Sequence, residues 1–408
     1  MEHILDILKE RGFIAQTTFE DELYEQLKEP TTFYVGFDPT ADSLHIGHYI
    51  PIMAMAHMQK AGHKPIALMG GGTAMIGDPS GKTDMRKMMT VETIDRNVES
   101  IKKQMERFLD FGEGKAIIVN NGDWLRHLNF IEFMRDIGSM FNVNRMLTAD
   151  CYKARMETEN GLSFLEFTYM LMQSYDFLEL FQRYGCRLEM GGNDQWSNML
   201  GGADLVRRKL GEKAFACTFQ LLLTHDGRKM GKTEAGALWL DANRVSPYDF
   251  FQYWRNVDDQ DVQKCLALLT FLPMDEVRRL GSLQGAEINE AKKILAYEIT
   301  KLVHGTDEAE KALKGAASAF GGREDSENIP TVEITEEELR QDARLSTLLI
   351  RAELCKGQND ARTMISQGAV SLNGEKVTDA MFAVTANQIG NGLLVKKGKK
   401  FRRVVLKK

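Results

Sequence analysis

An apolar segment followed by a turn and a helix start constrains the fold of this chain more than any other feature. Residues 33–37 have the composition of a buried strand, residues 38–44 form a turn, and His45-Ile46-Gly47-His48 begins a helix. A helix that starts behind a buried strand presents backbone N–H groups and the positive end of its dipole, which favours a phosphate. Two imidazoles add donors there, and Gly47 leaves room for a flat base against the backbone.

A second segment far downstream, Lys229-Met230-Gly231-Lys232-Thr233, places two lysines on a loop that contains glycine. Two point charges on a mobile loop suit the phosphates that the first segment would bind. Together and in this order, the two segments resemble the HIGH and KMSKS motifs of class I aminoacyl-tRNA synthetases. Gly231 and Thr233 replace the two serines of the second motif, while both lysines are retained.

Strand and helix patterns alternate through the first half of the chain. We expect strands over 32–37, 65–69, 116–120 and 186–190, and helices over 45–62, 91–111, 161–184 and 194–210. This order predicts an α/β fold with a doubly wound parallel, Rossmann-like sheet, in which ligands bind at the carboxyl ends of the strands. A helical domain is expected after the lysine loop, with helices over 247–255, 258–269, 274–280 and 288–304.

Charge is unevenly distributed along the chain. Residues 343–408 carry 13 Lys and Arg against 4 Asp and Glu, whereas the remainder carries 39 against 54. A basic module on an acidic body favours a polyanionic partner, which RNA, DNA or a ribosome would satisfy. The module has a hairpin signal at Asn373-Gly374 and a basic patch at 396–403. It resembles the small RNA-binding domain shared by a ribosomal small-subunit protein and pseudouridine synthases, so we expect RNA binding.

Patterns and resemblances together predict four parts of the chain. Residues 1–225 form the catalytic domain, which includes a dimerisation insert at about 121–160 that the family resemblance implies. Residues 226–320 hold the lysine loop and a helical domain on the anticodon side of a tRNA. An acidic linker spans 321–342 and can include one short strand or turn, and the RNA-binding module spans 343–408 together with its basic end.

Cysteine usage, apolar runs and two incomplete motifs exclude other classes of protein. The five cysteines are dispersed without a C-x-x-C pair, which argues against a disulfide framework or a structural zinc site and indicates a reducing cytoplasm. No apolar run reaches membrane-spanning length, and the N-terminus has no signal-peptide pattern. The glycines at 70–72 do not match the G-x-G-x-x-G pattern of dinucleotide-binding proteins, and residues 77–83 do not have the spacing of a Walker A phosphate-binding loop.

One expected helix carries three polar side chains on a single face. Tyr169, Gln173 and Asp176 stand at i, i+4 and i+7 of an otherwise apolar segment, so they project together. Such a set is either a satisfied buried network or a ligand-binding face. The pattern resembles the tyrosine-binding helix of bacterial tyrosyl-tRNA synthetases, and Tyr34 and Asp78 also fall where that family has ligands. The resemblance extends over essentially the whole chain.

The resemblance implies roles for individual residues of this sequence. Tyrosine would be bound through its phenol by Tyr34 and Asp176, through its ammonium group by Asp78, Tyr169 and Gln173, and through its carboxylate by Gln195. The ATP and adenylate site would be lined by Gly36, Asp38, Gly47, Gly192 and Asp194. The residues that stabilise the pyrophosphate end would be Thr40, His45, His48, Lys82, Arg86, Lys229 and Lys232.

The expected activity is therefore tyrosine activation by ATP, followed by transfer of the tyrosyl group to the terminal adenosine of tRNA(Tyr). Activation needs charge stabilisation and no general base, because the attacking carboxylate is already ionised. We expect ATP with Mg²⁺ as substrate, no resident metal or organic cofactor, a cytoplasmic homodimer and no membrane contact. Three alternatives stay open: a tryptophan-specific enzyme, a catalytically silent RNA-binding factor on the same scaffold, and a nucleotidyltransferase of cofactor synthesis.

Overall fold

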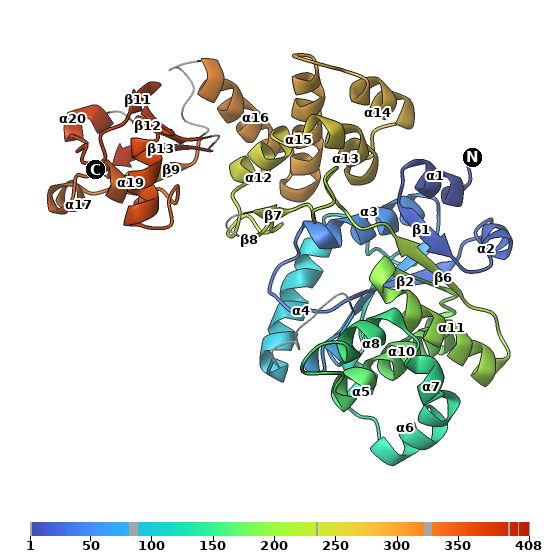
Figure 1. Cartoon of the computed structure of the whole chain (residues 1–408). Helices are drawn as coiled ribbons and strands as arrows, with labels where there is room; N and C mark the ends of the chain where they lie inside the picture. Colours follow the sequence, from blue (N-terminus) through green and yellow to red (C-terminus); the bar gives the residue numbers. More distant parts are fainter. Residues whose placement is uncertain are drawn as a thin grey trace. The chain divides into compact units, whose positions relative to one another are not determined.

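The chain divides into two compact units. The computed structural model describes residues 2–80, 89–233, 236–321, 329–390, 392–398 and 400–407. The first unit comprises Met1–Asp241 and Asp258–Ser282, and the second comprises Ala242–Val257 and Leu283–Lys408 (Figure 1). No helix within the described residues is both long enough and apolar enough to cross a membrane.

A six-stranded sheet forms the centre of the first unit. Its strands are β1 (Ile14–Thr17), β2 (Thr32–Phe37), β3 (Lys64–Met69), β4 (Ile117–Asn120), β5 (Leu188–Gly192) and β6 (Phe215–Phe219). They lie in the order β1-β6-β5-β2-β3-β4, and every neighbouring pair is parallel except β1 with β6. The doubly wound parallel sheet is therefore confirmed. Strand order reverses between β2 and β5, and in such sheets the ligand site lies at that switch point.

Helices surround this sheet. They are α1 (Ile4–Glu10), α2 (Glu20–Gln26), α3 (Ile46–Lys60), α4 (Val91–Met105), α5 (Gly122–Leu125), α6 (Phe130–Asp136), α7 (Val143–Met146), α8 (Asp150–Met156), α9 (Phe164–Phe167), α10 (Tyr169–Tyr184), α11 (Trp196–Leu210), α13 (Val262–Leu269) and α14 (Met274–Gly281). Short 3₁₀ turns lie at η1 (Thr73–Met75), η2 (Gly138–Met140), η3 (Asn193–Gln195) and η4 (Asp259–Asp261). A two-stranded hairpin, β7 (Lys232–Thr233) with β8 (Gly236–Ala237), follows β6.

Two expected helices differ from the structure at their ends. The helix expected over 161–184 is broken, because the Ser163 hydroxyl and the Glu166 carboxylate cap a separate α9 before α10 begins at Tyr169. The helix expected over 91–111 ends at Met105. Strands β1 and β6 were not expected at all, although all five residues of β6 are buried.

The helices α13 and α14 belong to the first unit, whereas the sequence placed them with the helical domain. The Arg11 side chain explains this, because it donates hydrogen bonds to the carbonyls of Ala267, Thr270 and Leu272, at 2.8, 3.1 and 2.5 Å. It thereby ties the loop after α1 to the end of α13. The hydroxyl of Tyr49 on α3 donates to the Leu269 carbonyl in the same region.

The second unit contains a helical part and a five-stranded sheet. Its helices are α12 (Pro247–Arg255), α15 (Ile288–His304), α16 (Thr306–Gly321), α17 (Glu336–Gln341), α18 (Leu345–Arg351), α19 (Gln358–Ser366) and α20 (Ala386–Ile389). Its strands are β9 (Thr331–Ile334), β10 (Val370–Leu372), β11 (Glu375–Val377), β12 (Leu393–Lys397) and β13 (Lys400–Leu406), in the order β11-β10-β12-β13-β9. The expected hairpin is present, with positive φ at Asn373 and Gly374, as a tight two-residue turn requires.

The described part of the expected acidic linker, residues 329–342, is structured. It forms β9, which pairs in parallel with β13, and α17, which begins with a Thr335–Glu338 capping box. The buried side chain of Ile334 joins the apolar core of the C-terminal module. One short strand was allowed for in this range, whereas the helix α17 was not expected, because the acidic residues that open it resemble a linker and only Leu339 of the helix is buried.

Candidate active site

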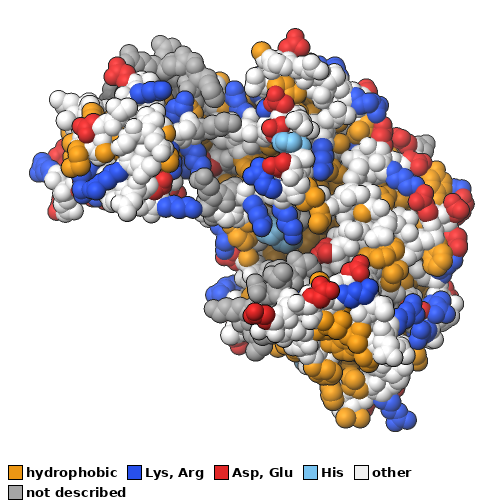
Figure 2. Space-filling view, in the orientation of Figure 1, with side chains coloured by type: hydrophobic (Ala, Val, Ile, Leu, Met, Phe, Trp, Pro, Cys, Tyr) orange, Lys and Arg blue, Asp and Glu red, His pale blue; other side chains and the backbone are white. Residues whose placement is uncertain are grey.

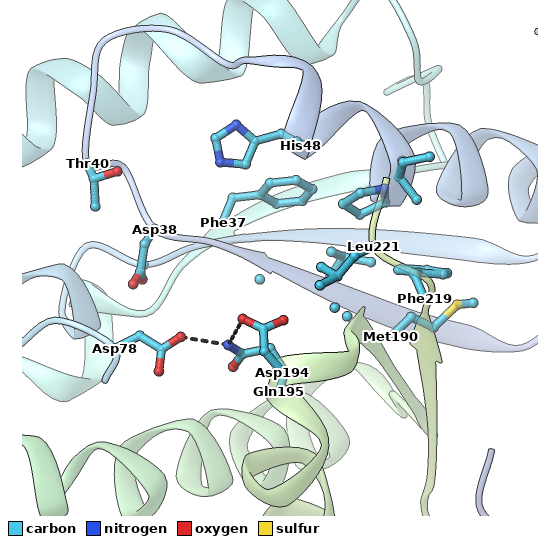
Figure 3. Close-up of a pocket in the computed structure, with 18 of the residues that line it drawn as sticks. Phe37, Asp38, Thr40, His48, Asp78, Met190, Asp194, Gln195, Phe219 and Leu221 are labelled. Atoms are coloured by element: carbon cyan, nitrogen blue, oxygen red, sulfur yellow. Dashed lines mark hydrogen bonds between the residues drawn. The ribbon is translucent and has the colours of Figure 1, made fainter. Parts of the chain in front are cut away.

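A cavity of about 510 Å³ opens at the carboxyl ends of β2 and β5, where the strand order reverses (Figure 3). Sixteen of the eighteen residues that the sequence nominated line this cavity. They are Tyr34, Gly36, Asp38, Thr40, His45, Gly47, His48, Asp78, Tyr169, Gln173, Asp176, Gly192, Asp194, Gln195, Lys229 and Lys232. The other two, Lys82 and Arg86, lie outside the described residues. All the lining residues belong to the first unit.

The two histidines cap the helix that begins at the cavity. The Nδ1 atom of His45 accepts a hydrogen bond from the Gly47 N–H, and the Nδ1 atom of His48 accepts from the His45 N–H, at 3.0 and 3.2 Å. The rings stack with their centroids 4.0 Å apart. Because each Nδ1 accepts, each neutral ring carries its proton on Nε2 and can donate to an anion.

The structure gives a more direct reason for glycine at position 47 than the room for a flat base that the sequence suggested. A Cβ atom at Gly47 would lie 2.8 Å from Cε1 of His45, so any side chain there would push the capping ring aside. Glycine therefore allows His45 to fold back over the first turn of α3. This contact explains the residue without reference to a bound base.

The lysine loop is joined to the start of α3 by backbone hydrogen bonds. The N–H of Ile46 donates to the Leu238 carbonyl at 2.9 Å, and the N–H of Leu238 donates to the Gly231 carbonyl at 2.8 Å. Met230 is buried and its sulfur lies 3.5 Å from the Cys265 sulfur. Lys229 and Lys232 are exposed at the cavity. Two segments nearly two hundred residues apart thus meet as the sequence predicted.

Two residues that sequence reasoning missed hold Asp176 in place. Trp124 Nε1 donates to one carboxyl oxygen of Asp176 at 2.7 Å, and Asn121 Nδ2 donates to the other at 2.8 Å. Burial raises the pKa of Asp176 well above its usual range, although both donors act in the opposite direction. Tyr34 of β2 is buried beside it, and its ring packs edge-on against Phe177. The sequence signal that could have identified Asn121 is its position directly after β4, because polar residues at the carboxyl ends of parallel strands lie near the ligand site.

A second carboxyl group lies at the same end of the cavity. The Gln195 Nε2 donates to Asp78 at 2.6 Å, and the Ser80 N–H donates to the other oxygen of Asp78 at 2.9 Å (Figure 3). Burial raises the pKa of Asp78 to about 6 against the effect of these two donors. Gln173 donates to Glu189, and Asn198 donates to Gln173. Sequence reasoning missed both Glu189 and Asn198.

Two aspartates approach the middle of the cavity from the ends of neighbouring strands, β2 and β5. Asp38 follows β2 and accepts a hydrogen bond from Thr73 at 2.9 Å, while Asp194 follows β5 (Figure 3). The hydroxyl of Tyr169 donates to the other oxygen of Asp38 at 3.4 Å. A Cβ atom at Gly192 would overlap an oxygen of the Asp194 carboxylate, so any side chain there would displace that carboxylate from its present position in the cavity.

The cavity therefore has two chemically different ends. Carboxyl groups line the end at Asp78 and Asp176, and they suit a cation and a hydroxyl group. Imidazole donors and lysines line the other end, and they suit a polyphosphate. Among the described residues, no cluster of three His, Cys, Asp or Glu is arranged to hold a metal ion.

Comparison with known proteins identifies the family of this chain. The family described as tRNA synthetases class I (W and Y) matches residues 25–321, and the tyrosine–tRNA ligase SYY-like C-terminal domain matches residues 323–404. The tyrosine–tRNA ligase of Clostridium tetani is 58% identical over 407 residues, which is 99% of both chains. The chain belongs to the class I tyrosyl-tRNA synthetases. As a member of this family it is an aminoacyl-tRNA ligase, and ATP is one of its substrates.

Other relatives agree with this assignment. The tyrosine–tRNA ligase of Fusobacterium nucleatum is 58% identical over 409 residues, covering 100% of this chain and 99% of that one. A truncated mitochondrial tyrosyl-tRNA synthetase from Aspergillus nidulans superposes with a TM-score of 0.70 at 29% identity, covering 78% of this chain and 95% of that one. A tryptophanyl-tRNA synthetase from Encephalitozoon cuniculi shares the fold at a TM-score of 0.54 and 17% identity, with coverages of 75% and 87%.

Proposed function

We propose that this chain is a tyrosine–tRNA ligase, which activates L-tyrosine with ATP and transfers the tyrosyl group to the terminal adenosine of tRNA(Tyr). The observation that carries this proposal is a single cavity with Asp176 and Tyr34 buried at one end and the stacked histidines at the other. An amino acid with a hydroxyl group and a nucleotide polyphosphate would fit these two ends. The tryptophan alternative is less favourable, because an indole offers no acceptor or hydroxyl to Tyr34.

Tyrosine would be held at both of its ends. Tyr34 and Asp176 bind the phenol hydroxyl, and Asp176 keeps its orientation through Trp124 and Asn121. The residues that bind the α-ammonium group are Asp78, Tyr169 and Gln173, and Gln195 orients the carboxylate. Burial of a donor and an acceptor that only a phenol satisfies gives selectivity against phenylalanine.

The first chemical step is a displacement at phosphorus. A carboxylate oxygen of tyrosine attacks the α-phosphorus of ATP, the bond to pyrophosphate breaks, and tyrosyl-adenylate and pyrophosphate form. The adenylate is lined by Gly36, Asp38, Gly47, Gly192 and Asp194. The groups that neutralise the developing charge are Thr40, His45, His48, Lys82, Arg86, Lys229 and Lys232, and Mg²⁺ enters with ATP.

The second step transfers the tyrosyl group to RNA. A ribose hydroxyl of the terminal adenosine attacks the tyrosyl carbonyl carbon and releases its proton as the ester bond forms, and AMP leaves with the electron pair of the mixed anhydride bond. The helical part of the second unit and the C-terminal module would bind the tRNA. The excess of Lys and Arg in residues 343–408 supports this role, because it favours a polyanion. The free state of all five cysteines agrees with our proposal of a cytoplasmic protein.

ATP–pyrophosphate exchange without tRNA tests the activation step directly. Labelled pyrophosphate should enter ATP when tyrosine is present, and phenylalanine and tryptophan should support exchange at least about a hundredfold less well. Exchange with tyrosine alone supports both the chemistry and the phenol site. Folded protein that exchanges with none of the three amino acids would instead favour the silent RNA-binding factor.

We also propose that the chain forms a homodimer through residues 121–160. Large apolar side chains are exposed on this insert and beside it: Phe130, Ile131, Val143 and Phe164 have 65%, 69%, 55% and 68% of their surface exposed. Hydrophobic side chains gather over the end of the first unit that carries α6 and α7 (Figures 1 and 2). A concentrated apolar patch of this kind is typical of a protein interface, and a second copy of the chain can cover it.

Ile131→Glu is expected to weaken this dimer at least about a hundredfold, because a charge placed in an apolar interface loses its hydration without a partner. Sedimentation velocity over a range of protein concentrations measures the change. The matched control is Met381→Glu on the C-terminal module, where a side chain of 64% exposure lies outside the patch. If both variants and the parent have the same dimer dissociation constant, the interface lies elsewhere on the chain.

A further inference from the structure

Glu189 is a buried carboxyl group to which the proposed roles give no function. It lies on β5 with 2% of its surface exposed, and it forms part of the cavity wall. Its Oε1 accepts a hydrogen bond from the Gln173 Nε2 at 2.9 Å. Its Oε2 is buried without a hydrogen-bond partner among the described residues. A buried carboxyl group with one oxygen unpaired is costly, so its presence beside a binding residue calls for a functional reason.

A chain of hydrogen bonds connects Glu189 to the far side of the tyrosine site. Asn198 Nδ2 donates to the Oε1 atoms of both Gln173 and Gln195, at 3.0 and 3.2 Å. The Gln195 Nε2 then donates to Asp78 at 2.6 Å. Both ends of this chain are carboxyl groups, and an ionised carboxylate only accepts.

The two carboxylates at its ends determine how the glutamine amides are turned. Because Glu189 accepts from Nε2 of Gln173, the Oε1 atom of that amide is directed away from Glu189. That oxygen has two lone pairs, and Asn198 uses one of them. The second lone pair can accept a hydrogen bond from a cation. If Glu189 were protonated, it could donate instead, and the amide would lose this fixed orientation.

We propose that Glu189 is a positioning residue for the α-ammonium group of tyrosine, which it serves by orienting the Gln173 amide and by adding negative charge behind it. This inference rests on the proposed function, because it requires Gln173 to contact that ammonium group. Glu189 itself does not touch the substrate in this scheme.

Glu189 is expected to change its protonation state within the pH range of a binding assay. Burial raises its pKa to about 7, against the opposite effect of the hydrogen bond from Gln173 and of the nearby Tyr34 hydroxyl. The titratable groups that face it are Tyr34 from β2, Asp176 from α10 and Cys186 from the turn before β5. Above its pKa, Glu189 is an anion that favours a cationic ligand. Affinity for the ammonium group should therefore fall as the pH decreases through about 7.

The test compares the parent chain with Glu189→Gln, which preserves shape and removes charge. Dissociation constants are measured for tyrosine, for tyramine, which lacks the carboxylate, and for 3-(4-hydroxyphenyl)propionate, which lacks the ammonium group. At pH values well above 7, the variant should bind tyrosine and tyramine about tenfold more weakly and should bind the third ligand normally. At pH values well below 7, the dissociation constants of the two proteins should converge, because the side chain at position 189 is then neutral in both. Asp78, with a pKa of about 6, contributes a further decrease that both share.

A double variant separates positioning from packing. In a Gln173→Ala background, the Glu189→Gln change should weaken tyramine binding by clearly less than tenfold, because the amide that Glu189 orients is absent and only its charge still acts. Equal weakening of all three ligands would overturn the proposal and assign Glu189 to the phenol through Tyr34. Unchanged affinities would also overturn it. Neither result affects the proposed function, which fails only if the parent chain shows no tyrosine-dependent exchange.

Discussion

Asp176→Ala is expected to lower kcat/KM for tyrosine in ATP–pyrophosphate exchange by about a thousandfold, or about 4 kcal/mol. The change removes the acceptor for the phenol and leaves the N–H groups of Trp124 and Asn121 buried without a partner. An unpaired buried donor costs about 1 to 3 kcal/mol, so the three lost interactions together reach this size. The relative rate with phenylalanine should rise, because the site no longer contains an acceptor that phenylalanine leaves unsatisfied.

The control for this prediction is a carboxylate on the same helix. Glu179 pairs with Arg183 one turn away on α10 and does not line the cavity. Glu179→Ala should keep kcat/KM within about twofold, since an ion pair near the surface contributes little. Thermal unfolding of both variants separates a binding loss from a loss of folded protein. A folded Asp176→Ala chain with parental selectivity for tyrosine over phenylalanine would contradict the assignment of this residue.

Sequence patterns identified the elements that carry the site because the relevant signals are local. The segment from Tyr34 to His48 shows its apolar strand and its helix start within fifteen residues, and both form as expected. Helical periodicity placed Tyr169, Gln173 and Asp176 on one face, and all three line the cavity. Such patterns depend only on the repeat of a strand or a helix.

Partners across the fold could not be predicted in the same way. Asn121 and Trp124 lie more than fifty residues before Asp176, and they meet it only because β4 and α10 are placed by the whole sheet. Glu189 lies between the buried residues Leu188 and Met190 on β5 and is itself buried, yet its contact with Gln173 depends on how α10 packs. The residues proposed to contact substrate are recognisable from the family resemblance, whereas the residues that orient them are found only from their hydrogen bonds.

Composition alone also gave little indication of how residues 329–342 fold. The acidic run around Glu336 resembles a linker, yet the capping box of Thr335 and Glu338 starts a helix there, and β9 before it completes a sheet. The apolar face of β9 is short, and Ile334 is its one fully buried side chain. A strand that contributes a single buried residue gives almost no periodic signal, because its stability comes from pairing with β13.

Gly231→Ala is expected to lower kcat for exchange about a hundredfold while leaving the dissociation constant for tyrosine unchanged. Gly231 has a φ of +83°, and a Cβ atom there would overlap the Cγ2 atom of Ile46. The lysine loop could then no longer lie against the start of α3, and Lys229 and Lys232 would lose their placement at the phosphates. The loss of one preorganised charge in a transition state costs about a hundredfold to a thousandfold in kcat. The residues proposed to bind the substrate tyrosine lie at the other end of the cavity, so the affinity for tyrosine should not change.

Gly227→Ala is the control that separates the steric overlap with Ile46 from the backbone strain of an alanine with positive φ. Gly227 precedes the same lysines with a φ of +81°, but a Cβ atom there meets nothing within 4 Å. It should lower kcat by no more than about tenfold, since a left-handed alanine costs only about 1 to 2 kcal/mol. Adding Ile46→Ala to Gly231→Ala removes the overlapping methyl group and should restore part of kcat. Equal effects of the two glycine substitutions, or no recovery with Ile46→Ala, would show that docking of the loop against α3 is not what Gly231 provides.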